Sequence, residues 1–322
     1  MATSFEEFQY VMGLFPRMAG VSLSETQHLY SSFLTAEREE LAEPMDFFKY
    51  YFDQNLGKPW RQSFLTRRQY ADLCRQVNDS GQSAVVADKA TFSAHFGPFL
   101  GRNVVVAHED ERAAFNELIS SQEQVFIKPA NGGYGLGTGF ASTADPDALW
   151  EKCVANRCVV EEPIAQHEIC AAPHPQSVNC VRVVSALQTG NAPVVIAAAL
   201  RTGEGGSVTD SGGGMAAPLD VSTGRVSGPA VTHFCEIYKT HPDTGARFEE
   251  IALPNWEGLL KSVERVAQHA SGLRLMNWDW ACRQDGTWIL IEGNVAGGIG
   301  ACQQASGRGY AHEIYAALGI GA

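Results

Sequence analysis

Residues 279–294 read DWACRQDGTWILIEGN, and this pattern predicts an antiparallel β-hairpin. Two apolar runs flank an Asp-Gly pair at 285 and 286, which is a strong signal for a tight turn. If the hairpin is centred on that pair, Asp279 and Glu292 face each other on neighbouring strands. Asn294 lies on the same strand face two residues further on. The three side chains therefore predict a magnesium site, because Mg²⁺ prefers oxygen ligands and is often shared with nucleotide phosphates.

An alternative interpretation of this hairpin is a pair of carboxylates on a solvated sheet face. The neighbouring residues argue against it, because Trp278, Trp280, Ile289 and Ile291 predict that the two strands are mostly buried. Like charges placed opposite each other in a buried sheet are destabilising unless a cation lies between them. The apolar neighbours therefore favour the metal interpretation.

Length and composition place the chain among globular proteins. It has 322 residues, of which 45% are hydrophobic and 19% charged, and a formal net charge of -12. This length suggests two packed units at about 150 residues per domain, and the acidic surface argues against a nucleic-acid partner. No apolar run reaches the roughly 20 residues of a membrane span. The first residues include Glu6 and Glu7 and do not resemble a signal peptide, so we expect a cytoplasmic protein without membrane contact.

The order of periodic segments predicts an α/β or an α+β fold. The first hundred residues have helical periodicity, and short β-branched runs then alternate with helical patterns. Six glycines between 203 and 214 predict a long loop of the kind that usually carries function. A single helix is expected near the C-terminus. The predicted strands cover 104–107, 124–129, 158–164, 177–188, 193–201, 275–283 and 287–292, and the predicted later helices cover 110–121, 145–156, 256–271 and 303–318.

A second chemical motif is the strand that carries Lys128 into a glycine-rich turn containing Gly133 and Gly135. Glycine lets backbone N–H groups converge on a phosphate, and the lysine adds a positive charge. The segment is not a P-loop, because it lacks the GK[ST] ending, and a strand-like sequence follows where a dinucleotide fingerprint would open a helix. A glycine-rich β-turn with a solvated lysine explains the segment equally well.

The segment 158–168, CVVEEPIAQHE, is an apolar strand that ends in acidic residues. Backbone groups from Glu162 to Ile164 could pair with an adenine edge, and Glu168 could accept hydrogen bonds from ribose hydroxyls. The His-Glu pair at 167 and 168 does not begin a zinc helix, because residue 171 is alanine.

Together these blocks resemble the ATP-grasp superfamily, whose members join a carboxylate to an amine or another nucleophile through an acyl phosphate. The resemblance covers about residues 85–320. Asp88 and Lys89 resemble its first lysine block, Lys128 the second, Glu161 to Glu168 the hinge, and the 279–294 hairpin the metal site. Segments that resemble the sugar-transfer-associated, or α-L-glutamate-ligase-related, branch are 177–182 (SVNCVR), 201–206 (RTGEGG), 212–214 (GGG), 241–245 (HPDTG) and 291–294 (IEGN).

The resemblance implies an α+β fold, with a helical region at 1–84 followed by an ATP-grasp domain at 85–322 with lobes at 85–165 and 166–322. ATP would bind between the lobes. It implies nucleotide contacts from Lys89, Lys128, Gly133, Gly135, Glu161, Glu162, Ile164 and Glu168, and Mg²⁺ on Asp279, Glu292 and Asn294.

One position departs from the family pattern. Many ATP-grasp ligases carry an arginine two residues before the metal aspartate, and this chain has Asn277 there. Another cation must then hold the acyl phosphate, and Arg182 and Arg201 are the candidates, because a guanidinium clamps carboxylate or phosphate groups with two hydrogen bonds. For each of them, an ordinary surface ion pair is the alternative.

The expected activity is therefore the ATP-dependent ligation of a small-molecule carboxylate to an amine, in a monomer or a homodimer. An ATP-dependent phosphotransferase on the same fold is the main alternative. A nucleotide-binding module without catalysis is a weaker one, because all three metal-site side chains are present.

Overall fold

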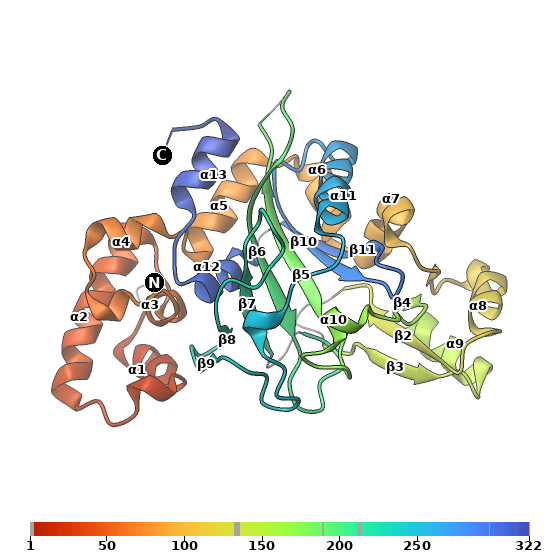
Figure 1. Cartoon of the computed structure of the whole chain (residues 1–322), viewed down its shortest axis with the longest axis horizontal. Helices are drawn as coiled ribbons and strands as arrows, with labels where there is room; N and C mark the ends of the chain where they lie inside the picture. The colour runs from red at the N-terminus through yellow and green to blue at the C-terminus, as the bar shows by residue number, and fades with distance from the viewer. Residues whose placement is uncertain (1–2, 132–135, 189, 211–213, 296, 322) are drawn as a thin grey trace.

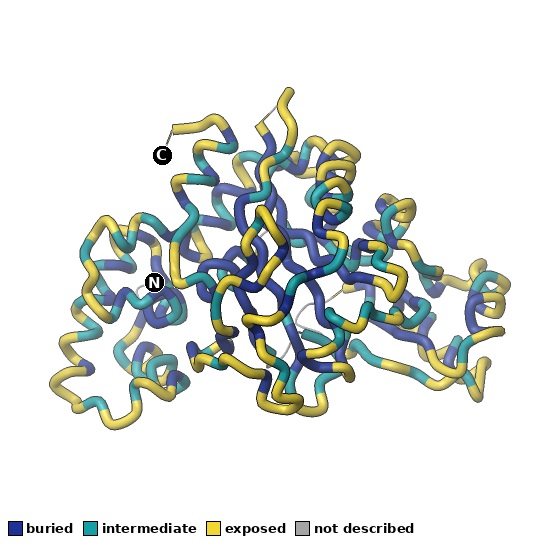
Figure 2. Tube along the Cα trace, in the orientation of Figure 1, coloured by how far each residue is buried: buried dark blue, intermediate teal, exposed yellow. Residues whose placement is uncertain are grey.

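The computed structural model describes residues 3–131, 136–188, 190–210, 214–295 and 297–321. It confirms the predicted α+β class, with a helical N-terminal region followed by two separate antiparallel sheets (Figure 1). Figure 2 shows that the buried part of the chain is concentrated in the larger sheet and the helices against it. No helix in the described ranges is long and apolar enough to cross a membrane.

The smaller sheet lies at one end of the molecule (Figure 1). Its strand order is β1-β4-β2-β3, with β1 at Val104–Val106, β2 at Gln124–Pro129, β3 at Gly139–Ser142 and β4 at Cys158–Glu161. Helices α8 (Arg112–Ile119) and α9 (Pro146–Ala155) pack on it through Phe115, Leu149 and Cys153. The strand predicted at 158–164 ends early, at Glu161, and the residues after it cross to the larger sheet.

The larger sheet has seven strands in the order β11-β10-β5-β6-β7-β8-β9. Helices α6 (Ser80–Ala87), α7 (Lys89–Leu100) and α11 (Trp256–His269) pack on one face, and α5 (Arg67–Val77), α12 (Ile299–Ser306) and α13 (Ala311–Leu318) pack on the other. The strands are β5 (Cys180–Ala186), β6 (Val194–Thr202), β7 (Met215–Leu219), β8 (Ala230–Thr232), β9 (Ile237–Tyr238), β10 (Leu275–Cys282) and β11 (Trp288–Asn294).

The N-terminal helices form a unit with its own aromatic core, at the opposite end of the molecule from the smaller sheet (Figure 1). Its core includes Phe8, Phe33, Phe47 and Phe48, and it contacts the larger sheet at Val231. The predicted division at residue 85 stays a prediction, and helices from both sides of it, α5 and α7, pack on the larger sheet. The unit comprises α1 (Phe5–Gly13), η1 (Pro16–Met18), α2 (Leu23–Glu40), α3 (Pro44–Lys49), η2 (Phe52–Gln54) and α4 (Lys58–Ser63).

The hairpin at 279–294 forms as predicted, but its register has two compensating irregularities. The turn is one residue longer than expected, because Arg283 donates its backbone N–H to Thr287 and three residues lie between them. Trp280 therefore pairs with Leu290. A β-bulge at Ile291 then restores the predicted pairing of Asp279 with Glu292. The bulge is the reason that the two carboxylates are opposed.

The C-terminal helix predicted at 303–318 is wrong in its extent, because the chain forms two helices, α12 (Ile299–Ser306) and α13 (Ala311–Leu318). Gly307 ends α12 in the left-handed region, with φ of 61°. Gly309 lies so close to the backbone of Ser63 that an added Cβ would be 2.0 Å from its carbonyl oxygen. Contact with the N-terminal unit therefore breaks the helix.

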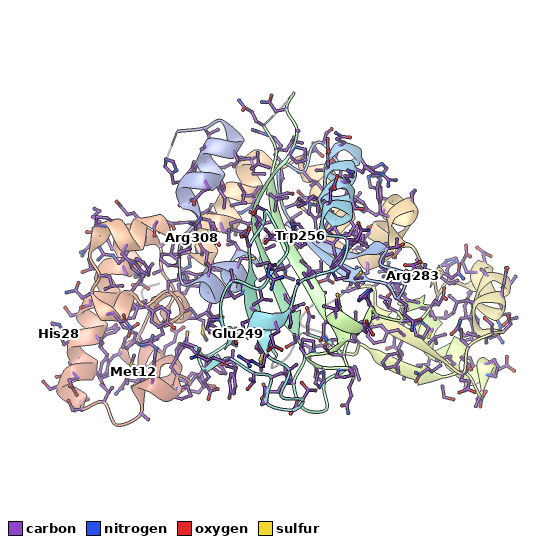
Figure 3. All side chains as sticks on the ribbon, viewed as in Figure 1. Met12, His28, Glu249, Trp256, Arg283 and Arg308 are labelled. Carbon is purple, nitrogen blue, oxygen red and sulfur yellow. The ribbon has the colours of Figure 1, made fainter. Side chains whose placement is uncertain are left out.

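Two short segments join the smaller sheet to the larger one. Glu162 donates its backbone N–H to the carbonyl of Asn103 (2.9 Å), and His167 donates to the carbonyl of Cys282 (2.9 Å). Arg283, labelled in Figure 3, donates to the carbonyl of Gly101 at 2.8 Å. The first bond joins the two connecting segments to each other, and the other two attach them to the β10–β11 hairpin. The remaining elements are η3 (Glu109–Glu111), α10 (Glu168–Ala171) and η4 (Phe248–Glu250).

Candidate functional site

A cluster of charged side chains lies on the face of the larger sheet that α5, α12 and α13 partly cover. Asp279 on β10 is the register partner of Arg182 on β5, so the two side chains project from the same face. Arg182 binds both oxygens of Asp279, with Nε 2.7 Å from Oδ1 and Nη2 on Oδ2. Arg201 on β6 lies beside them, with Nη1 3.6 Å from Oδ2 of Asp279. The structure thus brings both predicted arginines to the predicted metal aspartate.

The carboxylate of Asp279 stays ionised despite its burial. Its side chain is only 3% exposed, and burial alone would raise its pKa. Arg182 and Arg201 more than offset that effect and hold the pKa of Asp279 below its usual range. Burial and the nearby charge of Asp279 raise the pKa of Glu292. A proton or a metal ion at Glu292 would relieve this repulsion.

Asn294 joins the two carboxylates. Its Nδ2 lies 3.2 Å from Oε1 of Glu292 and 3.4 Å from Oδ2 of Asp279. The three predicted metal-site side chains are therefore neighbours in the structure. In the ranges that the structure describes, no group of three His, Cys, Asp or Glu side chains could hold a metal ion.

The donor set nevertheless suits Mg²⁺ shared with phosphate. Two carboxylates and one amide are hard oxygen ligands, and Mg²⁺ at nucleotide sites commonly uses one or two carboxylates with phosphates and water. Glu292 is the better placed carboxylate, because both oxygens of Asp279 already accept hydrogen bonds from Arg182. The residues present therefore fit Mg²⁺ with Glu292 as the principal protein ligand.

Lys128 is held by a buried ion pair. Its Nζ lies 2.9 Å from Oε2 of Glu161, which is the register partner of Phe126 on the neighbouring strand. Glu161 is 5% exposed and also binds Arg102, whose Nη2 lies 3.0 Å from Oε1. Although burial would raise the pKa of Glu161, Arg102 and Lys128 lower it to about 2. In this structure, the carboxylate of Glu161 binds the lysine and the arginine.

Arg102, which the sequence did not single out, connects the two sheets. It binds Glu161 of the smaller sheet, and its Nη1 donates to the carbonyl of Leu290 in β11 at 2.8 Å. Leu290 is two residues before Glu292. Lys128 is accordingly among the charges that lower the pKa of Glu292. The only sequence signal for Arg102 is a basic residue in the segment before a predicted strand.

The other predicted nucleotide contacts lie around this junction. Lys89 is the first residue of α7, and its backbone N–H donates to the carbonyl of Ala130 at 3.0 Å, two residues after Lys128. Glu162 accepts from the N–H of Asn103, Ile164 is partly buried, and Glu168 is exposed at the start of α10. Gly133 and Gly135 lie outside the described residues.

The loop predicted at 203–214 connects β6 to β7, and its ends are close together. Gly214 approaches Thr202 so closely that an added Cβ would lie 1.9 Å from its carbonyl oxygen. Asp210 was also missed by the sequence analysis, and its Oδ2 lies 3.2 Å from Nη1 of Arg201. Asp210 lies in a glycine-rich, weakly patterned segment, so only the fold reveals its pairing.

Asn277 occupies the position where many ligases have arginine, and it is structural here. It is completely buried, and its Nδ2 donates to the hydroxyl of Tyr70 at 2.9 Å and to the carbonyl of Asn294 at 3.1 Å. Helix α5, which carries Tyr70, thus supports the strand that holds the charged cluster.

A protein-family model described as sugar-transfer associated ATP-grasp matches residues 152–317, just over half of the chain. A search of curated protein sequences found no match. Among solved structures, the chain resembles D-alanyl-alanine synthetase A from Vibrio cholerae O1 biovar eltor str. N16961, at 14% identity and a TM-score of 0.43. That alignment covers 70% of this chain and 62% of the other.

Two further structures are similar to the chain. N5-carboxyaminoimidazole synthetase from Staphylococcus aureus, in complex with ADP, is 10% identical with a TM-score of 0.49, covering 81% of this chain and 60% of the other. The ATP-grasp ligase PsnB with a minimal precursor is 15% identical with a TM-score of 0.46, covering 75% and 62%. The chain thus spans about three fifths of the length of each of these three proteins.

Proposed function

The chain belongs to the sugar-transfer associated ATP-grasp family, and from this membership we propose that it is an ATP-dependent carboxylate–amine ligase acting through an acyl phosphate. One feature of the site supports this proposal most directly. The ion pair of Lys128 with Glu161 is tied through Arg102 to β11, two residues from Glu292. A lysine on one sheet and a carboxylate on another are thereby held at one junction, as the two sides of an ATP site require.

Under this proposal, Lys128 and Lys89 bind phosphate oxygens of ATP. The side chain of Lys128 loses little conformational freedom when it binds phosphate, because Glu161 already fixes its ammonium group. Mg²⁺, when bound by Glu292 and Asn294, would neutralise charge on the phosphates. Catalysis of phosphoryl transfer rests largely on positioning and electrostatics, so no protein nucleophile is required.

Arg201 is the proposed stabiliser of the charge that develops on the transferred phosphoryl group and the acyl phosphate. Arg182 is fixed on Asp279 through two hydrogen bonds, whereas Arg201 makes longer contacts, at 3.2 Å to Asp210 and 3.6 Å to Asp279. Exchanging these long contacts for a phosphate costs less than breaking a bidentate pair. Arg182 then has a supporting role, because it keeps Asp279 in place.

The test measures ADP release for a panel of small carboxylates, with and without amines, and traps acyl phosphates with hydroxylamine. A ligase forms a hydroxamate and consumes the amine in step with ADP release. A phosphotransferase, the alternative, releases ADP without an amine and leaves a stable phosphorylated product. No ADP release, together with no binding of Mg²⁺-ATP in calorimetry, would refute the assignment to the ATP-dependent ligases.

A further inference from the structure

The segments 177–182, 201–206 and 241–245, to which the proposed function gives no role beyond the two arginines, meet in one polar network that is buried at its histidines and exposed at Gly205 and Asp243. His174 and Ser177 come from the segment before β5, His241 and Asp243 from the segment after β9, and Gly203 and Gly205 from the start of the glycine-rich loop. His174, Ser177, Asn179 and His241 are each at most 2% exposed. The network surrounds the first residues of the loop.

Both backbone groups of Gly205 are held by this network. Its N–H donates to Oδ2 of Asp243 at 2.7 Å, and its carbonyl lies 2.9 Å from Nε2 of His174. Nε2 of His174 is also 3.7 Å from the same Asp243 oxygen. His241 holds the carbonyl of Gly203 through its own Nε2 at 2.9 Å. The loop therefore begins from a fixed point, two residues after Arg201.

Both ring nitrogens of His174 are held. Its Nε2 donates to the carbonyl of Gly205, because a carbonyl oxygen only accepts. Its Nδ1 lies 2.9 Å from Oγ of Ser177, which lies 2.7 Å from Oδ1 of Asn179 and accepts the backbone N–H of Gly203 at 3.1 Å. The Nδ2 atom of Asn179 donates to the carbonyls of Cys170 and His174. The imidazole is therefore fixed on both sides of the ring.

His241 is also held at both ring nitrogens. Its Nδ1 accepts the backbone N–H of Asp243 at 3.3 Å, and its Nε2 donates to the carbonyl of Gly203. Asp243 and His241 are the titratable groups that face His174 within the described part of the chain.

We propose that His174 and Asp243 are positioning residues, which clamp the two backbone groups of Gly205 and fix the start of the glycine-rich loop behind Arg201. The clamp itself stands on the contacts of the free protein. Its link to catalysis rests on the proposed function of Arg201, whose other loop partner is Asp210.

Hydrogen exchange of the free protein tests the clamp without turnover. We expect the protection factors of the Gly203 and Gly205 amides to be about fivefold to tenfold lower in the variant His174→Gln than in the wild type, because the imidazole contacts to the Gly205 carbonyl and to Ser177 are lost. The control His108→Gln, at an exposed histidine, should behave like the wild type.

The variant Asp243→Asn provides an independent test at a partly exposed site, should the buried His174→Gln fail to fold. It replaces the charged acceptor of the Gly205 N–H by a neutral amide oxygen, which accepts a weaker hydrogen bond, so the protection of the Gly205 amide should fall. Variants whose protection matches that of the wild type would overturn the clamp. In turnover assays, His174→Gln should lower kcat with little change in the KM for ATP; a normal kcat with lost protection would refute only the link to Arg201.

Discussion

The buried carboxylates Asp279 and Glu161 are each paired with cations, and these pairings decide what single substitutions do. Arg182 and Arg201 contact Asp279, Arg201 also contacts Asp210, and Lys128 binds Glu161. Removing one member of a buried pair leaves the other uncompensated, which costs more than the pair contributes. Lys128 and Arg201 are the most informative positions, because Glu161 keeps Arg102 and Asp279 keeps Arg182 when they are removed.

Replacing Lys128 with alanine should weaken ATP binding by roughly 1.5–3 kcal/mol, the range for a hydrogen bond to a charged group. Glu161 keeps its bond to Arg102, so the fold should tolerate the change. Isothermal titration calorimetry with Mg²⁺-ATP measures the effect, and the exposed Lys239→Ala is the matched control. Equal affinities for wild type and Lys128→Ala would remove Lys128 from the nucleotide site.

Replacing Arg201 with alanine should lower the ligation rate by about 10²-fold or more and change nucleotide affinity little, because its charge is needed as the acyl phosphate forms. Asp279 remains paired with Arg182. Steady-state kinetics measures kcat and the KM for ATP in the variant and the wild type, with the exposed Arg225→Ala as control. A variant with near-normal turnover would transfer this role to Arg182 or to another residue.

The β10–β11 hairpin shows how one element determines the geometry of the metal ligands. Its turn adds a residue and the bulge at Ile291 adds another on the opposite strand, so the side chains of Asp279 and Glu292 face each other. Without the bulge, the strand beyond Leu290 would be shifted by one residue and Glu292 would project from the other face. The Arg102 contact at Leu290 lies immediately beside the bulge.

The variant Glu292→Gln should abolish Mg²⁺-dependent ATP turnover while the metal-free protein keeps or gains stability. Burial and Asp279 raise the pKa of Glu292 in the folded state, so ionisation of this group opposes folding. For a carboxyl group with a raised pKa, the stabilising contribution is present below the unfolded-state pKa and is lost as pH rises through the folded-state pKa. Glutamine mimics the protonated form, so the variant should not lose stability as pH rises through the folded-state pKa of Glu292.

ADP release across a Mg²⁺ titration and metal-free melting temperatures at several pH values check this prediction. The exposed Glu257→Gln on α11 is the control. If the opposed carboxylates were a solvated pair, Glu292→Gln would leave turnover intact and shift stability by no more than about 0.5 kcal/mol. Unchanged turnover would therefore remove the metal site from the proposed mechanism.

At the scale of the whole molecule, the site lies where two sheets with separate cores meet. The smaller sheet packs with α8 and α9, and the larger one with helices on both faces. Arg102 crosses this junction with 3% of its side chain exposed, and it binds a carboxylate on one side and two carbonyls on the other. The arrangement of the lobes and the charge state of Glu161 are therefore coupled.

Replacing Arg102 with methionine should destabilise the protein by about 3 kcal/mol at neutral pH, at the lower end for a broken buried pair because Lys128 remains on Glu161. The pKa of Glu161, about 2 in the folded protein, lies below its unfolded value, so its stabilising effect is present above the unfolded pKa and is lost as pH falls. The difference in the free energy of unfolding between variant and wild type should therefore become smaller at acidic pH. Urea unfolding at neutral and acidic pH measures this difference, with the exposed Arg75→Met as control. A difference that does not change with pH would contradict the prediction.

The sequence alone determined the features that depend on local pattern and order. Alternating apolar residues around Asp285 and Gly286 indicated the hairpin, and its symmetry predicted the pairing of Asp279 with Glu292. The order of the lysine, hinge and hairpin blocks indicated the family. The change of periodicity near residue 103 indicated an α/β or α+β class, and the family resemblance selected α+β. These signals survive in a single sequence because they arise from neighbours along the chain.

Only the tertiary structure decided which charges pair, because those contacts join residues far apart in sequence. Arg102 meets Glu161 and Leu290 across two sheets, and Asp210 meets Arg201 only because the glycine-rich loop returns to its starting point. The break between α12 and α13 likewise depends on Ser63 in the N-terminal unit. Burial makes these pairings obligatory, since a desolvated charge must find a partner, but local sequence does not specify the partner.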